Sequence, residues 1–158
     1  ELSREGKLLR YSILHFACHG FFDSSATDLS SLVFSEVSGQ LSSVSDEDGY
    51  LTVAEASSLK LDAELVCLSA CNTGRGSVRS GDGLIGLQRA FLVAGSKYVG
   101  VSLWYVDDAA TAEFMVRMYK KVNEGMSYAK AYKSVKNEFR KDEDWAHPFY
   151  WAPFVLYE

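Results

Sequence analysis

The segments ILHFACHG, residues 13–20, and LVCLSACNTG, residues 65–74, decide the fold of this chain. Each is an apolar run that stops at a reactive side chain followed by turn residues. Apolar runs of this kind are typical of strands in a parallel sheet that is covered on both faces. We therefore predict two buried strands, over residues 11–17 and 64–70, with His19 and Cys71 at their ends.

A histidine and a cysteine at these positions suggest a catalytic pair. The carboxyl ends of neighbouring parallel strands share one rim of the sheet, and ligands bind at that rim. His19 and Cys71 can meet there although 71 − 19 = 52 positions separate them. A thiol becomes a strong nucleophile near neutral pH when an imidazole acts as its base. We therefore predict a cysteine hydrolase in which the backbone N–H groups of Gly20 and Cys71 form the oxyanion hole.

Two other interpretations of these residues remain open. Cys71 can be a small buried hydrophobe and His19 the capped end of a strand. Alternatively, His15, Cys18, His19, Cys67 and Cys71 form a tetrahedral zinc set, although their spacings match no strong structural-zinc pattern. We expect His15 to be a hydrogen-bonded core histidine, and Cys18 and Cys67 to be packing residues.

The composition is that of a single ordered domain. The chain has 158 residues, 47% of them hydrophobic, and only two prolines, which is enough for one sizeable core. A net charge of −5 argues against direct contact with nucleic acid, and no apolar run is long enough to cross a membrane. Three cysteines without disulfide spacing favour a reducing compartment, so we expect a cytoplasmic protein.

The remaining pattern alternates strands and helices, which predicts an α/β fold. Thr52 and Glu55 have the spacing of a capping box, and Gly95 is placed to end a helix. The glycine-rich stretch 72–83 is expected to be the most mobile part. The expected strands cover about 31–36, 97–104 and 153–157, and the expected helices cover 53–58, 84–94, 108–122 and 127–140.

Other polar motifs admit modest interpretations. Either Asp107 or Asp108 is expected to cap the helix that follows, and both can line a specificity pocket beyond the strand end. The aromatic cluster at His147 is interpreted as packing. Gly81-Asp82-Gly83 is similar to an anion-binding turn but lacks the lysine and spacing of a phosphate loop.

Together, these motifs resemble those of the CHAT domain family, which are caspase-like cysteine peptidases often fused to TPR repeats. The resemblance rests, in chain order, on HFACHG, LSACNTG, GDGLIGLQRAF, SLWYVDD and HPFYWAPF, and it spans about residues 11–157. It implies a caspase-hemoglobinase-like fold with a mostly parallel central sheet and helices on both faces. It also implies a dyad of His19 and Cys71, with Gly20 in the oxyanion hole.

The resemblance further implies how a substrate binds. The primary specificity pocket of related peptidases lies beside the strand that matches Val101–Trp104, so Ser102 and Trp104 become substrate-binding candidates. Asp107 and Asp108 become candidates for binding a basic residue before the cleaved bond. The expected ligand is a protein or peptide, with no metal or organic cofactor.

The same resemblance predicts a larger protein. A complete caspase-like sheet has strands before the histidine strand, and they are absent here. We expect them upstream in a longer chain, rather than in another chain or within residues 2–9, with residues 1–158 as its C-terminal CHAT domain. TPR-fused relatives are held inactive until a partner binds, in bacterial immune or death-like pathways. The competing class is a catalytically silent caspase-like module that binds partners.

Overall fold

A computed structural model describes residues 3, 5–21, 30–34, 48–69, 71–72 and 82–158, and for 71–72 and 82–83 it describes the backbone only. Most of the glycine-rich stretch 72–83 therefore lies outside the described residues. So do the last two residues of the predicted strand 31–36 and most of the loop that follows it.

The main sheet has four strands in the order β1-β5-β7-β8. Strands β1 (Ile13–Phe16), β5 (Ala63–Leu68) and β7 (Ser96–Ser102) are parallel, and β8 (Phe154–Tyr157) is antiparallel to β7. The mostly parallel α/β sheet predicted from the sequence is thus confirmed.

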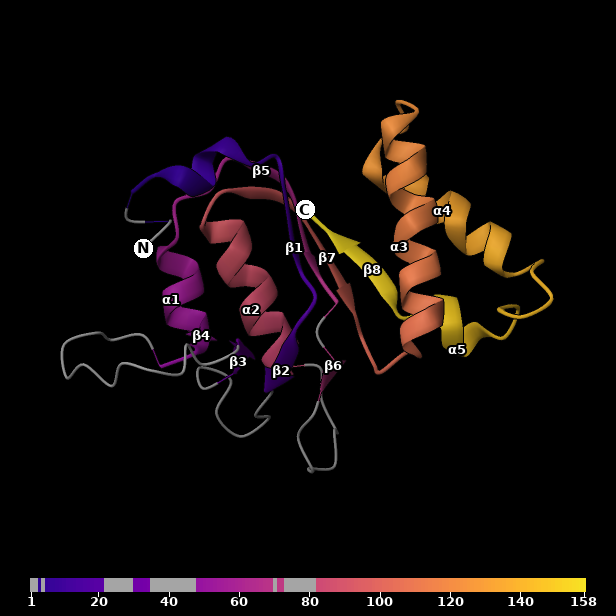
Figure 1. Cartoon of the computed structure of the whole chain (residues 1–158), viewed down its shortest axis with the longest axis horizontal. Coiled ribbons are helices and arrows are strands. Elements are labelled where there is room, and N and C mark those ends of the chain that lie inside the picture. Colours follow the sequence, from indigo (N-terminus) through magenta and orange to yellow (C-terminus); the bar gives the residue numbers. More distant parts are fainter. Residues whose placement is uncertain (1–2, 4, 22–29, 35–47, 70, 73–81) are drawn as a thin grey trace.

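Helices cover both faces of this sheet and form three layers (Figure 1). On one face lie α1 (Val53–Ser58) and α2 (Asp82–Val93); on the other lie α3 (Asp108–Asn123), α4 (Tyr128–Phe139) and the short α5 (Pro148–Trp151). Side chains of β5 alternate between the two cores, Val66 facing α2 and Leu65 facing α3. The apolar residues of β5 therefore contribute to one core or the other.

A second, smaller sheet was not predicted. It has the order β4-β3-β2-β6, with β4 (Tyr50–Thr52), β3 (Ser31–Val33), β2 (His19–Phe21) and β6 (Cys71–Asn72). The sequence predicted a loop over residues 20–30 and a strand over 64–70. Gly20 and Phe21 instead belong to β2, residues 22–29 lie outside the described residues, and β5 confirms the second strand but ends at Leu68. Strands of two or three residues are too short to show a hydrophobic period.

Strand β1 lies at the edge of the described main sheet. The family resemblance implies further strands before this one in the sheet, and within the described residues only β5 pairs with it. Residues Lys7–Arg10 form a 3-10 helix, η1, so this segment supplies no strand. The partly exposed side chains of β1 fit an edge position.

Two turn predictions are confirmed in atomic detail. The Thr52 hydroxyl accepts from the Glu55 N–H at 3.3 Å, and Glu55 Oε2 accepts from the Thr52 N–H at 2.8 Å, which completes the capping box of α1. Gly95 ends α2 with φ of +113°, and an added Cβ would lie 2.3 Å from the carbonyl oxygen of Leu61. Only glycine fits at this position.

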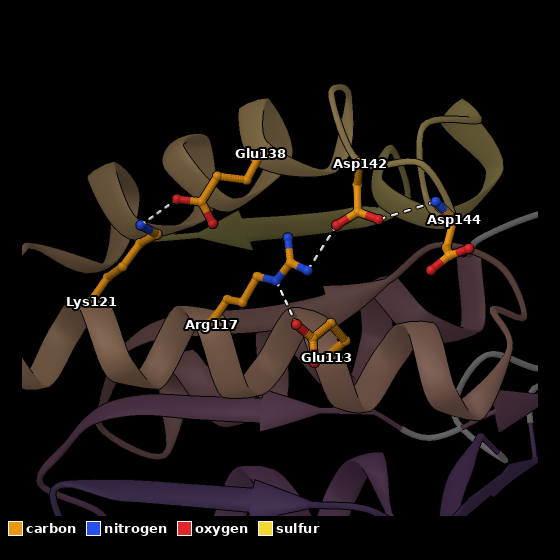
Figure 2. A network of polar contacts seen from close by, with 6 residues as sticks. All are labelled: Glu113, Arg117, Lys121, Glu138, Asp142 and Asp144. Atoms are coloured by element: carbon orange, nitrogen blue, oxygen red, sulfur yellow. Dashed lines mark hydrogen bonds and ion pairs between the residues drawn. The ribbon is translucent and has the colours of Figure 1, made fainter.

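Ion pairs tie α3 to α4 and to the segment that follows it (Figure 2). Arg117 contacts Glu113 at 2.6 Å and Asp142 at 2.8 Å, and Lys121 contacts Glu138 at 2.5 Å. The Arg117 guanidinium holds the pKa of Asp142 below its usual value. This network links α3 to α4 and to the segment after α4 on this face of the sheet.

Candidate active site

The structure brings His19 and Cys71 together at the level of the backbone. They are register partners in the parallel strands β2 and β6, and Gly20 is the partner of Asn72. In the main sheet, Ile13 pairs with Leu65, an offset of 65 − 13 = 52, the same as 71 − 19 = 52. The two segments of the chain that form β1 and β5 in the main sheet therefore pair again as β2 and β6 in the small sheet, with the same register (Figure 1).

His19 is exposed, and an open groove begins beside it. The groove has a volume of about 600 Å³. Its lining residues come from the edge of β1, from β2 and from the end of β3: His15, Phe16, Ala17, Cys18, His19, Val33 and Phe34. An imidazole on an open groove is accessible to a peptide, unlike a histidine sealed in a core.

Gly20 is buried in the middle of β2, between Leu32 of β3 and Asn72 of β6. It lies directly after His19, where the sequence predicted the first oxyanion donor. The second predicted donor, the Cys71 N–H, is in the paired strand β6. Both backbone donors therefore belong to neighbouring strands of the small sheet.

The other two cysteines are in environments that suppress reactivity. Cys67 is fully buried, with its sulfur 3.6 Å from Met115 Sδ and 3.9 Å from the Tyr132 hydroxyl. Burial raises the pKa of Cys67 to about 11. Cys18 is half-buried, and burial raises its thiol pKa as well. Both pack against hydrophobic cores as predicted, and neither is a thiolate near neutral pH.

His15 is hydrogen-bonded, as the sequence predicted, but it is exposed on the edge strand rather than set in the core. Its Nε2 lies 2.6 Å from the Ser69 hydroxyl and its Nδ1 lies 3.0 Å from the Tyr119 hydroxyl. Desolvation lowers the pKa of His15. The sequence offered no signal for its partner Tyr119, which is 104 positions away on α3.

The zinc set is not assembled from the described side chains. Among those, no three histidine, cysteine, aspartate or glutamate residues are arranged to hold a metal ion. Cys67 faces the core beside α3 and α4, whereas Cys18 packs against the opposite core.

The predicted substrate-binding residues lie beyond the carboxyl end of β7. Ser102 ends that strand and donates to the Trp104 carbonyl at 2.7 Å. The Trp104 indole N–H donates to the Phe149 carbonyl at 3.1 Å, and 42% of Trp104 stays exposed. This end of β7 is on the same side of the parallel sheet as the ends of β1 and β5, where the chain leads to His19 and Cys71.

Asp107 is the cap of α3, which confirms the capping expectation for one of the two aspartates. Its Oδ1 accepts from the N–H groups of Ala109 at 2.9 Å and Ala110 at 3.3 Å. Asp108 is the first residue of the helix, and both aspartates are exposed. The Asp108 carboxylate makes no capping bond among the described contacts.

His147 has a structural role. It caps α5 by accepting the Phe149 N–H on Nδ1 at 3.2 Å, with Pro148 at the first helical position. The aromatic cluster around it packs in the layer of α3 and α4, where the ring centroids of Trp145 and Tyr150 are 5.2 Å apart. Packing was the predicted role, whereas the helical turn itself was not predicted.

Fold and register define the class of the protein, an α/β domain of caspase-like architecture. The chain belongs to the CHAT domain family, whose model matches residues 1–158. It is 35% identical over 106 residues to tetratricopeptide repeat protein 28 of mouse and, to the same extent, of human. This alignment covers 67% of the chain but 4% of each relative. No described helix is long and apolar enough to span a membrane.

Proposed function

We propose that the chain is a cysteine endopeptidase with Cys71 as nucleophile and His19 as general base. The observation that carries this proposal is the pairing of both residues across the parallel strands β2 and β6. Neighbouring strands are about 4.8 Å apart, so side chains of paired residues are within reach of one another. The exposed His19 beside an open groove supports access for a peptide.

The proposed reaction needs no cofactor. His19 takes the thiol proton, and the Cys71 sulfur adds to the scissile carbonyl carbon while the N–H groups of Gly20 and Cys71 stabilise the oxyanion. The C–N bond breaks as the imidazolium gives its proton to the departing amine, leaving a thioester. Water then adds to the thioester and gives a proton to His19. That proton returns to the sulfur as the acid product leaves.

Substrate selection is assigned to the end of β7 and the start of α3. Ser102 and Trp104 would border the peptide, and Asp107 and Asp108 would attract a basic side chain before the cleaved bond. Exposure of both carboxylates supports this assignment. Asparagine also caps helices well, so the double variant Asp107→Asn and Asp108→Asn removes charge while keeping α3. An unchanged cleavage profile of that variant across a peptide library would exclude the pocket.

The same proposal includes control by a TPR or other regulatory region in a longer protein, of which residues 1–158 are the C-terminal domain. The similarity to tetratricopeptide repeat protein 28 supports such an association. A cytoplasmic setting and an immune or death-like pathway belong to the same expectation.

The decisive experiment is peptide cleavage by the full chain against variants of the pair. Cys71→Ala and His19→Ala are each expected to lower kcat/KM by about 1,000-fold, in the range for loss of a nucleophile or general base. Cys18→Ala is the matched control, because Cys18 lines the same groove but has no proposed role. Iodoacetamide should modify Cys71 faster than Cys18 and the buried Cys67, and His19→Ala should remove the advantage of Cys71 over Cys18. Labelling of Cys71 no faster than Cys18 in the wild type would favour a catalytically silent binding module.

A further inference from the structure

A chain of hydrogen bonds runs from α3 to the point where the chain crosses from the main sheet to the small one. The Tyr119 hydroxyl is 3.0 Å from His15 Nδ1, and His15 Nε2 is 2.6 Å from Ser69 Oγ. Ser69 in turn donates its N–H to the Phe16 carbonyl at 3.1 Å and its hydroxyl to the same oxygen at 3.5 Å. The two segments at the crossing, one after β1 and one after β5, are therefore both linked to α3 through Tyr119.

A neutral imidazole can join these two partners in either tautomer, because the Ser69 and Tyr119 hydroxyls can each donate or accept. Burial raises the pKa of Tyr119 and desolvation lowers that of His15. The phenol therefore keeps its proton and the imidazole is neutral near pH 7, so the three side chains form an uncharged chain of hydrogen bonds.

In either direction, the contact joins Ser69, which follows β5, to His15 of the neighbouring strand β1. Together with the bonds from Ser69 to the Phe16 carbonyl, it links the two segments at the crossing.

The location of the crossing makes this contact matter for the proposed pair. Phe16 is three residues before His19, and Ser69 is two residues before Cys71. The offset of 52 between the paired chains is the same before and after the crossing, from 68 − 16 = 52 to 71 − 19 = 52. Misplacement of a catalytic group by about 1 Å can cost about 100-fold in rate.

We propose that His15 and Tyr119 are positioning residues for the pair of Cys71 and His19, acting through Ser69. This inference rests on the proposed function. They fix the crossing so that the register of the main sheet carries into the small sheet. Neither residue touches the substrate in this assignment.

The test measures the rate of iodoacetamide reaction at Cys71 as a function of pH in the full chain, together with peptide kcat and KM. His15→Ala should slow alkylation and lower kcat by about 10- to 100-fold, leave KM within about twofold, and raise the apparent pKa of Cys71 toward the value of a free cysteine, about 8.5. His15→Gln offers Ser69 an amide group that can donate or accept where Nε2 stood and should restore most of the rate. Tyr119→Phe should fall between wild type and His15→Ala.

Tyr128→Phe is the matched control, because Tyr128 packs on Tyr98 at the same face of the sheet, with ring centroids 5.7 Å apart. It should behave as wild type. Melting temperatures of all variants separate misfolding from mispositioning, and if His15→Ala fails to fold, Tyr119→Phe and His15→Gln supply the comparison.

The outcomes separate this inference from the proposed function. Wild-type alkylation rates and pH profiles in His15→Ala and Tyr119→Phe would overturn the positioning role. So would a defect in His15→Ala that His15→Gln does not relieve. If His19→Ala leaves Cys71 alkylation unchanged, the dyad itself is wrong, whatever the His15 variants do.

Discussion

The main sheet and the small sheet share two segments of the chain, residues 13–21 and 63–72, but the two sheets differ in how deeply these segments are buried. In the main sheet, the segments form β1 and β5, and β5 is buried by cores on both faces. In the small sheet, the same segments form β2 and β6, where His19 is exposed beside a groove. The comparison indicates that packing fixes the register in the first sheet, and that the second sheet keeps this register at a place open to solvent.

The largest effect should come from truncating an aromatic ring in the core beside the main sheet. Phe114 of α3 is fully buried and stacks on Phe154 with ring centroids 4.1 Å apart. Phe114→Ala should lower the free energy of unfolding by about 3–5 kcal/mol, measured by urea denaturation. Phe21→Ala is the control in the small sheet, because Phe21 is 44% exposed, and it should cost far less. Equal losses would refute the division of labour between the sheets.

A smaller loss of stability should follow from adding one methyl group inside the main sheet. A Cβ at Gly100 of β7 would lie 2.1 Å from the Tyr132 hydroxyl and 3.6 Å from Cys67 Sγ. Gly100→Ala must displace Tyr132 and should cost about 1–3 kcal/mol of stability.

Gly125→Ala separates this clash from backbone strain. Gly125 has φ of +92° but nothing within 4 Å of an added Cβ, so the variant carries strain without a clash. Thermal unfolding of both variants compares the two effects. A Gly100→Ala protein as stable as wild type would mean that Tyr132 moves aside freely.

The sequence predicted the main sheet well and the small sheet poorly, for a physical reason. The apolar stretches at β1, β5 and β7 are typical of buried strands, so the strands themselves could be anticipated, whereas β1 was expected at the centre of the sheet and lies at its described edge. Strand β6 has two residues and owes its pairing to the register of β5 behind it. The meeting of His19 and Cys71 was predicted at a shared rim, whereas the contact between His15 and Tyr119 depends on tertiary packing that no local pattern encodes.

Removing the side-chain cap of α1, which lies next to the small sheet, should lower the free energy of unfolding by about 1 kcal/mol. Thr52 ends β4 and caps α1 through its hydroxyl, and Thr52→Ala removes that acceptor. Ser127 is a matched control, because it occupies the cap position of α4 without a side-chain capping bond. Urea denaturation should therefore show a loss for Thr52→Ala and little change for Ser127→Ala. The reverse ranking would contradict the capping geometry.

The smallest effect should be a pH dependence that originates at the edge of the main sheet. Desolvation lowers the pKa of His15 in the folded chain from its usual value of 6.5. Well above pH 6.5 the imidazole is neutral in both the folded and the unfolded states and adds no pH dependence to the free energy of unfolding. As the pH falls below 6.5, the unfolded state binds a proton first, so the free energy of unfolding decreases until folded His15 is protonated too.

The His15→Gln variant isolates this contribution, because its amide does not titrate. The difference in free energy of unfolding between wild type and His15→Gln should be constant above pH 7 and should shift against the wild type between pH 6.5 and 5. Carboxylates such as Asp142, whose pKa Arg117 lowers, titrate in both proteins and cancel in the difference. A pH-independent difference would mean that Tyr119 and Ser69 hold the protonated ring as well as the neutral one.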